Sequence, residues 1–167
     1  MPSLSENTPP SVVVTGAGDP WLDDELARFR EHNGREVRLN ARELLEPATL
    51  FQAFAREMSF PDYFGHNWDA LVDCLSDPSL HTSSTAVLID DADLLLGAEH
   101  LGLFVAVLCQ AARRVSTASE LALHGVLLLN ETDPGEFEPQ IGSRADVVTE
   151  MVQGRLTAVI PARPGAR

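Results

Sequence analysis

The sequence predicts an α/β fold in which a mainly parallel β-sheet is covered by packed helices. One reason is that short apolar runs alternate along the chain with longer segments of helical periodicity. Another is that several runs, such as "SVVV", "AVLI" and "VLLL", are nearly continuous in apolar residues instead of alternating. Strands that are buried on both faces are typical of parallel sheets, because their crossover helices cover both sides.

The first half of the chain is expected to contain two strands and two helices. Residues 1–10 are polar and proline-rich, so we expect them to be disordered. Asp19 suits an N-cap and Pro20 a first helical position, and Gly34 ends that helix. The predicted elements are a strand at 12–15, a helix at 19–33, a strand at 35–40 and a helix at 46–60 that Pro61 terminates.

The second half continues the alternation, with Asn67 as the cap of a short helix. The tail at 144–161 has two interpretations, a short helix followed by a strand or a hairpin around Gln153-Gly154. We favour the hairpin because Val, Thr and Ile dominate this tail. The other predicted elements are a helix from Trp68 to about Ser76, a strand at 85–89, an apolar helix at 100–115, a strand at 126–129 and frayed residues at 161–167.

Length and charge restrict the possible partners. The chain of 167 residues suits one domain, and its 25 acids against 12 bases give a formal charge of −13. Between Arg56 and Arg113 lie 56 residues without Lys or Arg, and nine acids fall in that stretch. A protein charged in this way repels nucleic acid and anionic membranes. It is expected to attract cationic proteins or metal ions.

Cysteine usage and the chain's start favour the cytoplasm. Cys74 and Cys109 lie in apolar-periodic stretches and are expected to be free and buried. The first ten residues have neither the basic nor the apolar region of a signal peptide. No apolar run approaches the roughly 20 residues of a membrane-spanning helix. We therefore expect a soluble, cytoplasmic protein, with a monomer favoured.

The segment "VVVTGAGDP" has two interpretations. A strand that runs into Gly-x-Gly and a helix start is typical of a dinucleotide-binding turn. The third glycine of that motif is missing, and Asp19 would put a carboxylate where pyrophosphate binds. We favour a structural strand-to-helix turn.

The segment "DDAD" follows the predicted strand at 85–89. Asp90, Asp91 and Asp93 stand where α/β enzymes hold Mg²⁺, so a metal-dependent hydrolase is one hypothesis. A solvated turn stabilised by Asx hydrogen bonds is the favoured alternative. The five histidines show no metal-ligand spacing, and no metal or cofactor is expected.

The segment "FPDYFGHNWDALVDCLSD", residues 60–77, carries the most unusual pattern. At 100° per residue, Trp68, Leu71, Val72 and Leu75 share one helical face, with Val72 at its border. Asp69, Asp73 and Asp77 form an adjoining stripe with no base nearby in the sequence. Like charges four residues apart destabilise a helix by roughly 0.2–0.5 kcal/mol per pair. The spacing alone leaves open a solvated face or a binding surface for something positive.

This segment resembles the central motif of the barstar family, intracellular inhibitors of guanyl-preferring ribonucleases. The resemblance lies in the Pro-acid-Tyr-aromatic-Gly run, the following Asn, and Asp-Ala-Leu-x-Asp-Cys-Leu. It extends over residues 36–130 and implies a barstar-like layered fold there. Residues 11–35 would add an N-terminal strand and helix, and 131–167 a C-terminal extension packed on the same domain.

The resemblance also implies binding residues. Tyr63 matches a loop tyrosine that stacks on the nuclease, and Asp69 and Asp73 match helix aspartates that occupy phosphate-binding positions. Two positions depart from the pattern. Val72 replaces a contacting tryptophan, and Gln110 stands where an inhibitory glutamate is expected. The remaining candidate contacts, at the rim, are Asp62, His66 and Asp77.

The favoured hypothesis is therefore a non-enzymatic, stoichiometric inhibitor of a basic ribonuclease or a related cationic toxin. In it, an acidic helix and the loop before it block the nuclease active site, as in antitoxin or immunity proteins. The first alternative is a barstar-fold interaction module without nuclease inhibition, which Val72 and Gln110 favour. The second is the metal-dependent hydrolase that would use the aspartates of "DDAD".

Overall fold

One six-stranded sheet organises the molecule, in the order β2-β3-β4-β1-β6-β5. The computed structural model describes residues 3–161. Strands β2, β3, β4 and β1 are mutually parallel, whereas β6 runs antiparallel to β1 and β5 antiparallel to β6. The predicted α/β class with a mainly parallel sheet is thus confirmed. The strands are β1 (Val12–Gly16), β2 (Arg35–Asn40), β3 (Thr85–Asp90), β4 (Leu123–Leu129), β5 (Val148–Val152) and β6 (Arg155–Val159).

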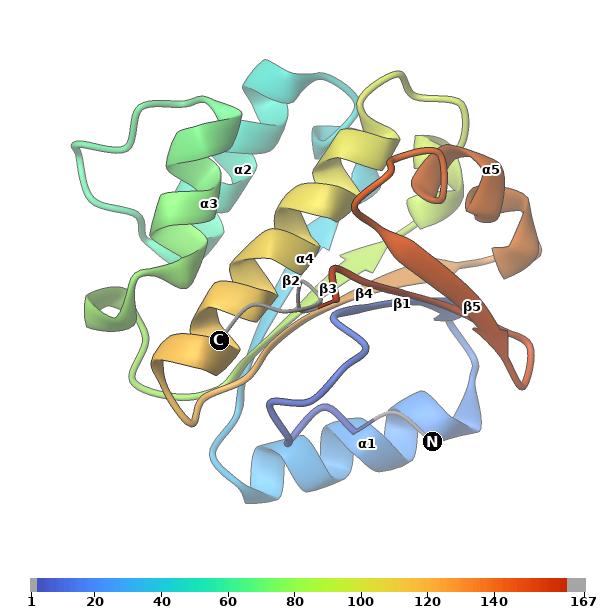
Figure 1. Ribbon diagram of the computed structural model, residues 1–167, viewed down its shortest axis with the longest axis horizontal. Coiled ribbons are helices and arrows are strands. Elements are labelled where there is room, and N and C mark those ends of the chain that lie inside the picture. Colours follow the sequence, from blue (N-terminus) through green and yellow to red (C-terminus); the bar gives the residue numbers. More distant parts are fainter. Residues whose placement is uncertain (1–2, 162–167) are drawn as a thin grey trace.

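The helices divide unequally between the two faces of the sheet. Figure 1 shows α1 (Pro20–Glu31) on one face and α2 (Pro47–Met58), α3 (Trp68–Ser76) and α4 (Leu101–Ala118) on the other. A short α5 (Glu138–Ile141) precedes the final hairpin. Successive strand residues point to opposite faces, so Val12 and Val14 join the larger core under α2–α4, whereas Val13 joins the smaller core under α1.

Sequence signals set where the helices begin and end. The Asp19 side chain accepts a hydrogen bond from the Trp21 N–H, with Pro20 at the start of α1. Helix α2 ends at Met58, and the next residue, Ser59, has a φ of 54° and precedes Pro61 by two residues. The Asn67 side chain caps α3 by accepting from the Ala70 N–H at 2.8 Å, as predicted.

Segments outside residues 36–130 complete the same sheet. Strand β1 pairs with β4, and β6 and β5 follow it outward. The tail forms the favoured hairpin, which turns at Gln153 and Gly154 with φ values of 51° and 83°. Residues 162–167, most of the tail expected to fray, lie outside the described residues, as do residues 1–2.

The structure corrects the expectation of disorder for part of residues 1–10. Leu4 is only 1% exposed and belongs to the core under α1. Its N–H donates to the Glu25 carboxylate of α1 at 3.0 Å. The polar composition gave no sign of this contact. One buried leucine and two backbone carbonyls that hydrogen-bond to a histidine are enough to hold the segment against the domain. Those carbonyls belong to Glu6 and Pro10, and each lies within 3.0 Å of a ring nitrogen of His124.

Helix α4 is the longest helix and lies at the centre of the larger core. By length and composition alone, its 18 residues are apolar enough to cross a membrane, which differs from the expectation that no such run exists. In the structure α4 packs against the sheet and α3, and much of it is buried inside the fold. Cys74 on α3 and Cys109 on α4 are both free and buried, as predicted.

Candidate partner-binding face

The loop between α2 and α3 holds one tyrosine out in solvent. Phe60 and Phe64 anchor the loop, with ring centroids 5.0 Å apart and Phe64 only 5% exposed. Phe64 also makes an edge contact with Phe51 of α2 at 6.4 Å. Tyr63, between these anchors, is 72% exposed. Because its neighbours are fixed by aromatic packing, the tyrosine is presented on a supported loop instead of a free one.

Helix α3 follows this loop and carries Asp69 in its first turn. Asp69 is exposed, and the positive end of the helix dipole favours a carboxylate there. Trp68 beside it is half-buried and packs edge-on against Phe51 at 4.9 Å. The tryptophan thus fixes the start of α3 against α2, so the position of Asp69 follows from core packing.

Asp73 has a partner that the sequence pattern did not indicate. Arg114 of α4 donates through Nη1 to Asp73 Oδ1 at 3.0 Å. Both side chains remain largely in solvent, with the aspartate 72% and the arginine 50% exposed. The expectation that the stripe lacks any basic neighbour is therefore wrong at this position. The two residues are 41 apart in the sequence, and only the packing of α3 on α4 joins them.

Asp77 does not continue the stripe as an open carboxylate. It ends α3 and accepts hydrogen bonds from the N–H and the hydroxyl of Ser79, at 2.9 and 2.8 Å. These bonds lower the pKa of the Asp77 carboxyl below its ordinary value. Its carboxylate already stabilises a turn, so Asp77 is a weaker candidate contact than Asp69.

The other predicted contact positions divide clearly by exposure. Asp62 and His66 are exposed on the loop, and the His66 ring lies beside Phe64 with Nδ1 3.0 Å from the Phe64 carbonyl oxygen. Gln110 is exposed on α4, one helical turn before Arg114. Val72 is only 4% exposed and belongs to the larger core.

The structure corrects the assignment of Val72 as a contact residue. Its side chain turns inward with Leu71 and Leu75, on the face where the helical geometry placed it, and so away from a partner. Sequence reasoning also missed Arg114. The signal was available, since Arg114 lies four residues after Gln110 and such residues share one helical face. We call the exposed set Asp62, Tyr63, Asp69 and Asp73 the acidic face.

The aspartates of "DDAD" each have a structural partner. Asp90 pairs with Arg38 at 2.8 Å, and Asp91 accepts from the side-chain amides of Asn40 and Asn130 at 2.8 and 2.7 Å. Asp93 accepts three backbone N–H groups, from Asn130, Glu131 and Thr132. Across residues 3–161 no group of three or more His, Cys, Asp or Glu side chains could hold a metal ion. These contacts match the favoured interpretation of a hydrogen-bonded turn.

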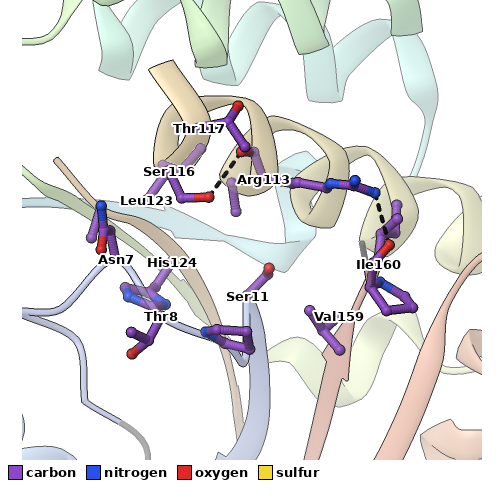
Figure 2. Close-up of a pocket in the computed structure, with 14 residues that line it drawn as sticks. Asn7, Thr8, Ser11, Arg113, Ser116, Thr117, Leu123, His124, Val159 and Ile160 are labelled. Atoms are coloured by element: carbon purple, nitrogen blue, oxygen red, sulfur yellow. Dashed lines mark hydrogen bonds between the residues drawn. The ribbon is translucent and has the colours of Figure 1, made fainter. Parts of the chain in front are cut away.

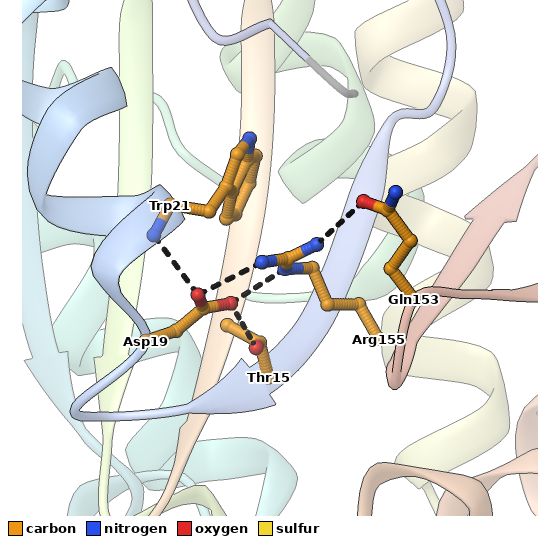
Figure 3. A network of polar contacts seen from close by, with 5 residues as sticks. All are labelled: Thr15, Asp19, Trp21, Gln153 and Arg155. Atoms are coloured by element: carbon orange, nitrogen blue, oxygen red, sulfur yellow. Dashed lines mark hydrogen bonds and ion pairs between the residues drawn. The ribbon is translucent and has the colours of Figure 1, made fainter.

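Charged side chains of the protein itself, Asp19 and Arg155, occupy the "TGAG" turn. Figure 3 shows Asp19 between Thr15, Trp21 and Arg155, and its carboxylate pairs with the guanidinium at 2.5 and 2.9 Å. The arginine also lies over the Trp21 ring, 5.1 Å from its centroid. An acidic cap at the start of α1 occupies the position where a phosphate would bind, as the structural interpretation predicts.

Comparison with known protein families finds a match to barstar (barnase inhibitor) over residues 34–126. These are 93 of the 167 residues, and they include α2, the loop, α3 and α4. The chain belongs to the barstar family. The whole acidic face, together with Gln110 and Arg114, lies inside the part that the family matches. No curated protein sequence matches the chain.

Solved structures resemble the barstar-family chain in fold. The ORC2 protein of Aeropyrum pernix in its ADP form matches with a TM-score of 0.58 at 14% identity, over 83% of this chain and 41% of that chain. The ADPNP–ADP complexes of the same protein give a TM-score of 0.48 at 16% identity, over 79% and 38%. At such identity the first likeness shows the α/β fold alone, and this chain spans about two fifths of the ORC2 chain.

Proposed function

We propose that the protein is a stoichiometric inhibitor of a ribonuclease and acts without catalysis or cofactor. The observation that carries the proposal is the acidic face, which lies on a supported loop and the first two turns of a helix within the barstar-family region. A ribonuclease cleft is lined with cationic side chains that hold RNA phosphates. Carboxylates on a packed helix can supply negative charge in place of those phosphates.

In this mechanism, Tyr63 and the two helix aspartates have different roles. Tyr63 supplies a large exposed ring at the centre of the contact, where aromatic residues typically contribute much of the binding energy. Asp69 and Asp73 occupy phosphate-binding positions of the nuclease. The charge of −13 speeds the encounter with a basic protein and keeps nucleic acid away. The complex would form in the cytoplasm with one inhibitor monomer per nuclease.

A second candidate function is supported by α4. Where the resemblance leads us to expect an inhibitory glutamate, the chain has Gln110. One helical turn later, Arg114 forms an ion pair with Asp73. These features favour an interaction module of barstar fold whose partner is a different basic protein. The partner would still be cationic opposite Asp69, so the two functions differ in the partner and not in the surface.

The test is inhibition of ribonucleases by titration. Purified protein is added to barnase and to guanyl-preferring ribonucleases of the same organism, and RNA cleavage is followed at low and high salt. We expect inhibition to saturate at one equivalent for the cognate nuclease and to weaken as salt rises. The double variant Asp69→Ala/Asp73→Ala is expected to lose at least about tenfold in affinity, since truncated contacts at interface centres often cost more than 1.4 kcal/mol.

The matched control is Asp23→Ala/Asp24→Ala on α1. It removes the same charge from exposed positions on the opposite face of the sheet. It is expected to inhibit like the natural sequence at moderate salt. Equal losses from both double variants would show that net charge, and not the acidic face, drives binding. A failure of all tested nucleases, combined with capture of another basic protein through Asp69, would favour the interaction module.

A further inference from the structure

A separate cavity lies at the end of the sheet where β1 and β4 begin and β6 ends. Its volume is about 230 Å³, and 14 residues line it (Figure 2). They come from the N-terminal segment, the second half of α4, the start of β4 and the end of β6. The volume is many times that of a single bound water. It falls below the roughly 300–1,000 Å³ of sites for drug-sized ligands, so it suits a small molecule.

The walls of this cavity are held in place by backbone hydrogen bonds. The Ser11 N–H donates to the Ala158 carbonyl at 3.1 Å, and the Ser11 carbonyl accepts from the Gly125 N–H at 2.9 Å. His124, only 4% exposed, holds the preceding residues through the carbonyls of Glu6 and Pro10. The segment that closes the cavity is therefore fixed before any ligand arrives, which lowers the entropic cost of binding.

Two hydrogen-bond donors in the cavity wall are available to a ligand. Ser11 is 7% exposed, its hydroxyl points into the cavity in Figure 2, and it has no hydrogen-bond partner among residues 3–161. Arg113 uses Nη1 to donate to the Pro161 carbonyl at 2.8 Å. Its guanidinium has five N–H donors in a fork that matches a carboxylate. The Ser11 hydroxyl faces the cavity, so a ligand oxygen placed there would gain a hydrogen bond.

The charge of the cavity contrasts with that of the whole molecule. None of its 14 lining residues is Asp or Glu, although the chain has 25 acids. Ser116 and Thr117 donate their hydroxyls to the Arg113 and Arg114 carbonyls within α4, so both hydroxyl protons are already used. The apolar part of the lining consists mainly of Ala112 on α4, Leu123 on β4, and Val159 and Ile160 at the end of β6.

We propose that this cavity binds a small monocarboxylate with a short apolar body. The carboxylate would accept hydrogen bonds from the Arg113 guanidinium and the Ser11 hydroxyl, and the body would lie on the apolar wall. A single arginine balances one negative charge. A phosphate dianion would carry a second charge against the field of a chain at −13, so it fits less well. The site does not depend on the acidic face or on ribonuclease inhibition.

Benzoate and its neutral isostere benzamide test the proposal on the full chain. Each is titrated into ¹⁵N-labelled protein, and amide chemical shifts are followed at constant ionic strength. Benzoate is expected to saturate with a dissociation constant of about 1 mM or tighter, with shifts confined to the cavity lining. Benzamide is expected to bind at least about tenfold more weakly, because it lacks the charge that the arginine pairs. Benzoate is also expected to raise the melting temperature more than benzamide does.

Three variants separate the site from general charge effects. Arg113→Gln is expected to weaken benzoate at least about tenfold and Ser11→Ala about threefold or more, in line with lost hydrogen bonds to a charged ligand. The control Arg144→Gln removes an exposed arginine that does not line this cavity, and it is expected to bind benzoate normally. Equal binding of the two probes, equal losses in Arg113→Gln and Arg144→Gln, or shifts that match those from sodium chloride alone would each overturn the proposal.

Discussion

At the scale of single residues, the ion pair between Asp73 and Arg114 alters how the acidic face works. In the free protein the arginine already occupies one carboxylate that the proposed function assigns to the nuclease. A basic partner must therefore displace Arg114 or bind beside it. Exposed pairs of this kind contribute only about 0–1 kcal/mol. Displacing Arg114 therefore costs little free energy, but that cost still lowers the affinity for the partner.

This pair leads to a prediction for Arg114→Gln. The change frees the Asp73 carboxylate and makes the face more negative, so affinity for a basic partner should rise by about two- to tenfold. The free energy of unfolding should fall by less than about 1 kcal/mol. Inhibition titrations and urea unfolding measure the two quantities. Arg28→Gln on α1 is the matched control, and a similar gain there would attribute the effect to net charge.

At the scale of elements, α3 is a nine-residue helix that side chains hold at both ends. The Asn67 side chain accepts from the Ala70 N–H at its start, and a ring nitrogen of His81 lies 2.7 Å from the Leu75 carbonyl oxygen near its end. So short a helix is marginal by itself, and its apolar face and caps must hold it. The acidic face therefore depends on residues that would not touch a partner.

Asn67→Ala is predicted to weaken binding indirectly. Loss of the cap should lower the free energy of unfolding by about 1 kcal/mol and loosen the turn that carries Asp69. Affinity for the nuclease should fall as well, while Asn67→Ser, which can still cap, should restore most of both. Chemical unfolding and inhibition assays provide the measurements. If Asn67→Ala lost affinity but no stability, a direct contact by Asn67 would be indicated instead.

The turn between β1 and α1 is joined to the C-terminal hairpin by a nearly buried ion pair. The side chains of Asp19 and Arg155 are 10% and 12% exposed. Breaking one partner of such a pair typically costs about 3–5 kcal/mol, because the other charge is left without compensation. Arg155→Gln is therefore predicted to lower the unfolding free energy by about 3 kcal/mol.

Urea unfolding of Arg155→Gln and of Asp19→Asn/Arg155→Gln checks this assignment. The double variant removes both charges and should lose less stability than the single one. A single variant within about 0.5 kcal/mol of the natural sequence, the range of ordinary surface substitutions, would contradict a structural role for the pair.

At the scale of the molecule, the sequence predicted the class of fold, the four longer helices, the six strands and the acidic stripe that begins at Asp69, but not the short α5. Those features depend on local periodicity, caps and turn residues, which short windows of sequence contain. It did not predict the pair between Arg114 and Asp73 or the ordered contact of Leu4. Each of these depends on how elements far apart in the sequence pack together. Helical spacing could place Arg114 on the face of Gln110, but it could not pair Arg114 with Asp73 on another helix.

The dependence of stability on pH should report on two carboxylates, Asp93 and Asp19, at the ends of the parallel strands. Burial acts to raise the pKa of Asp93, but the N–H groups of Asn130, Thr132 and Glu131 together hold that pKa far below its ordinary value. The Arg155 guanidinium is the main cause of the lowered pKa of Asp19. A carboxyl whose pKa is lower in the folded state stabilises the fold above its unfolded pKa, near 4, and this contribution is lost as pH falls toward the folded pKa.

The free energy of unfolding should therefore decline between about pH 5 and pH 2. Asp93→Asn is predicted to be less stable than the natural sequence at pH 7, by about 1–3 kcal/mol, and to lose less as the pH is lowered. Unfolding curves at several pH values, with Asp24→Asn as the exposed control, measure both slopes. If Asp93→Asn and the natural sequence followed parallel pH profiles, Asp93 would not be the group that links the ends of β3 and β4 to acid stability. In that case the ionised Asp19, which joins β1 to the hairpin, would be the next carboxylate to test.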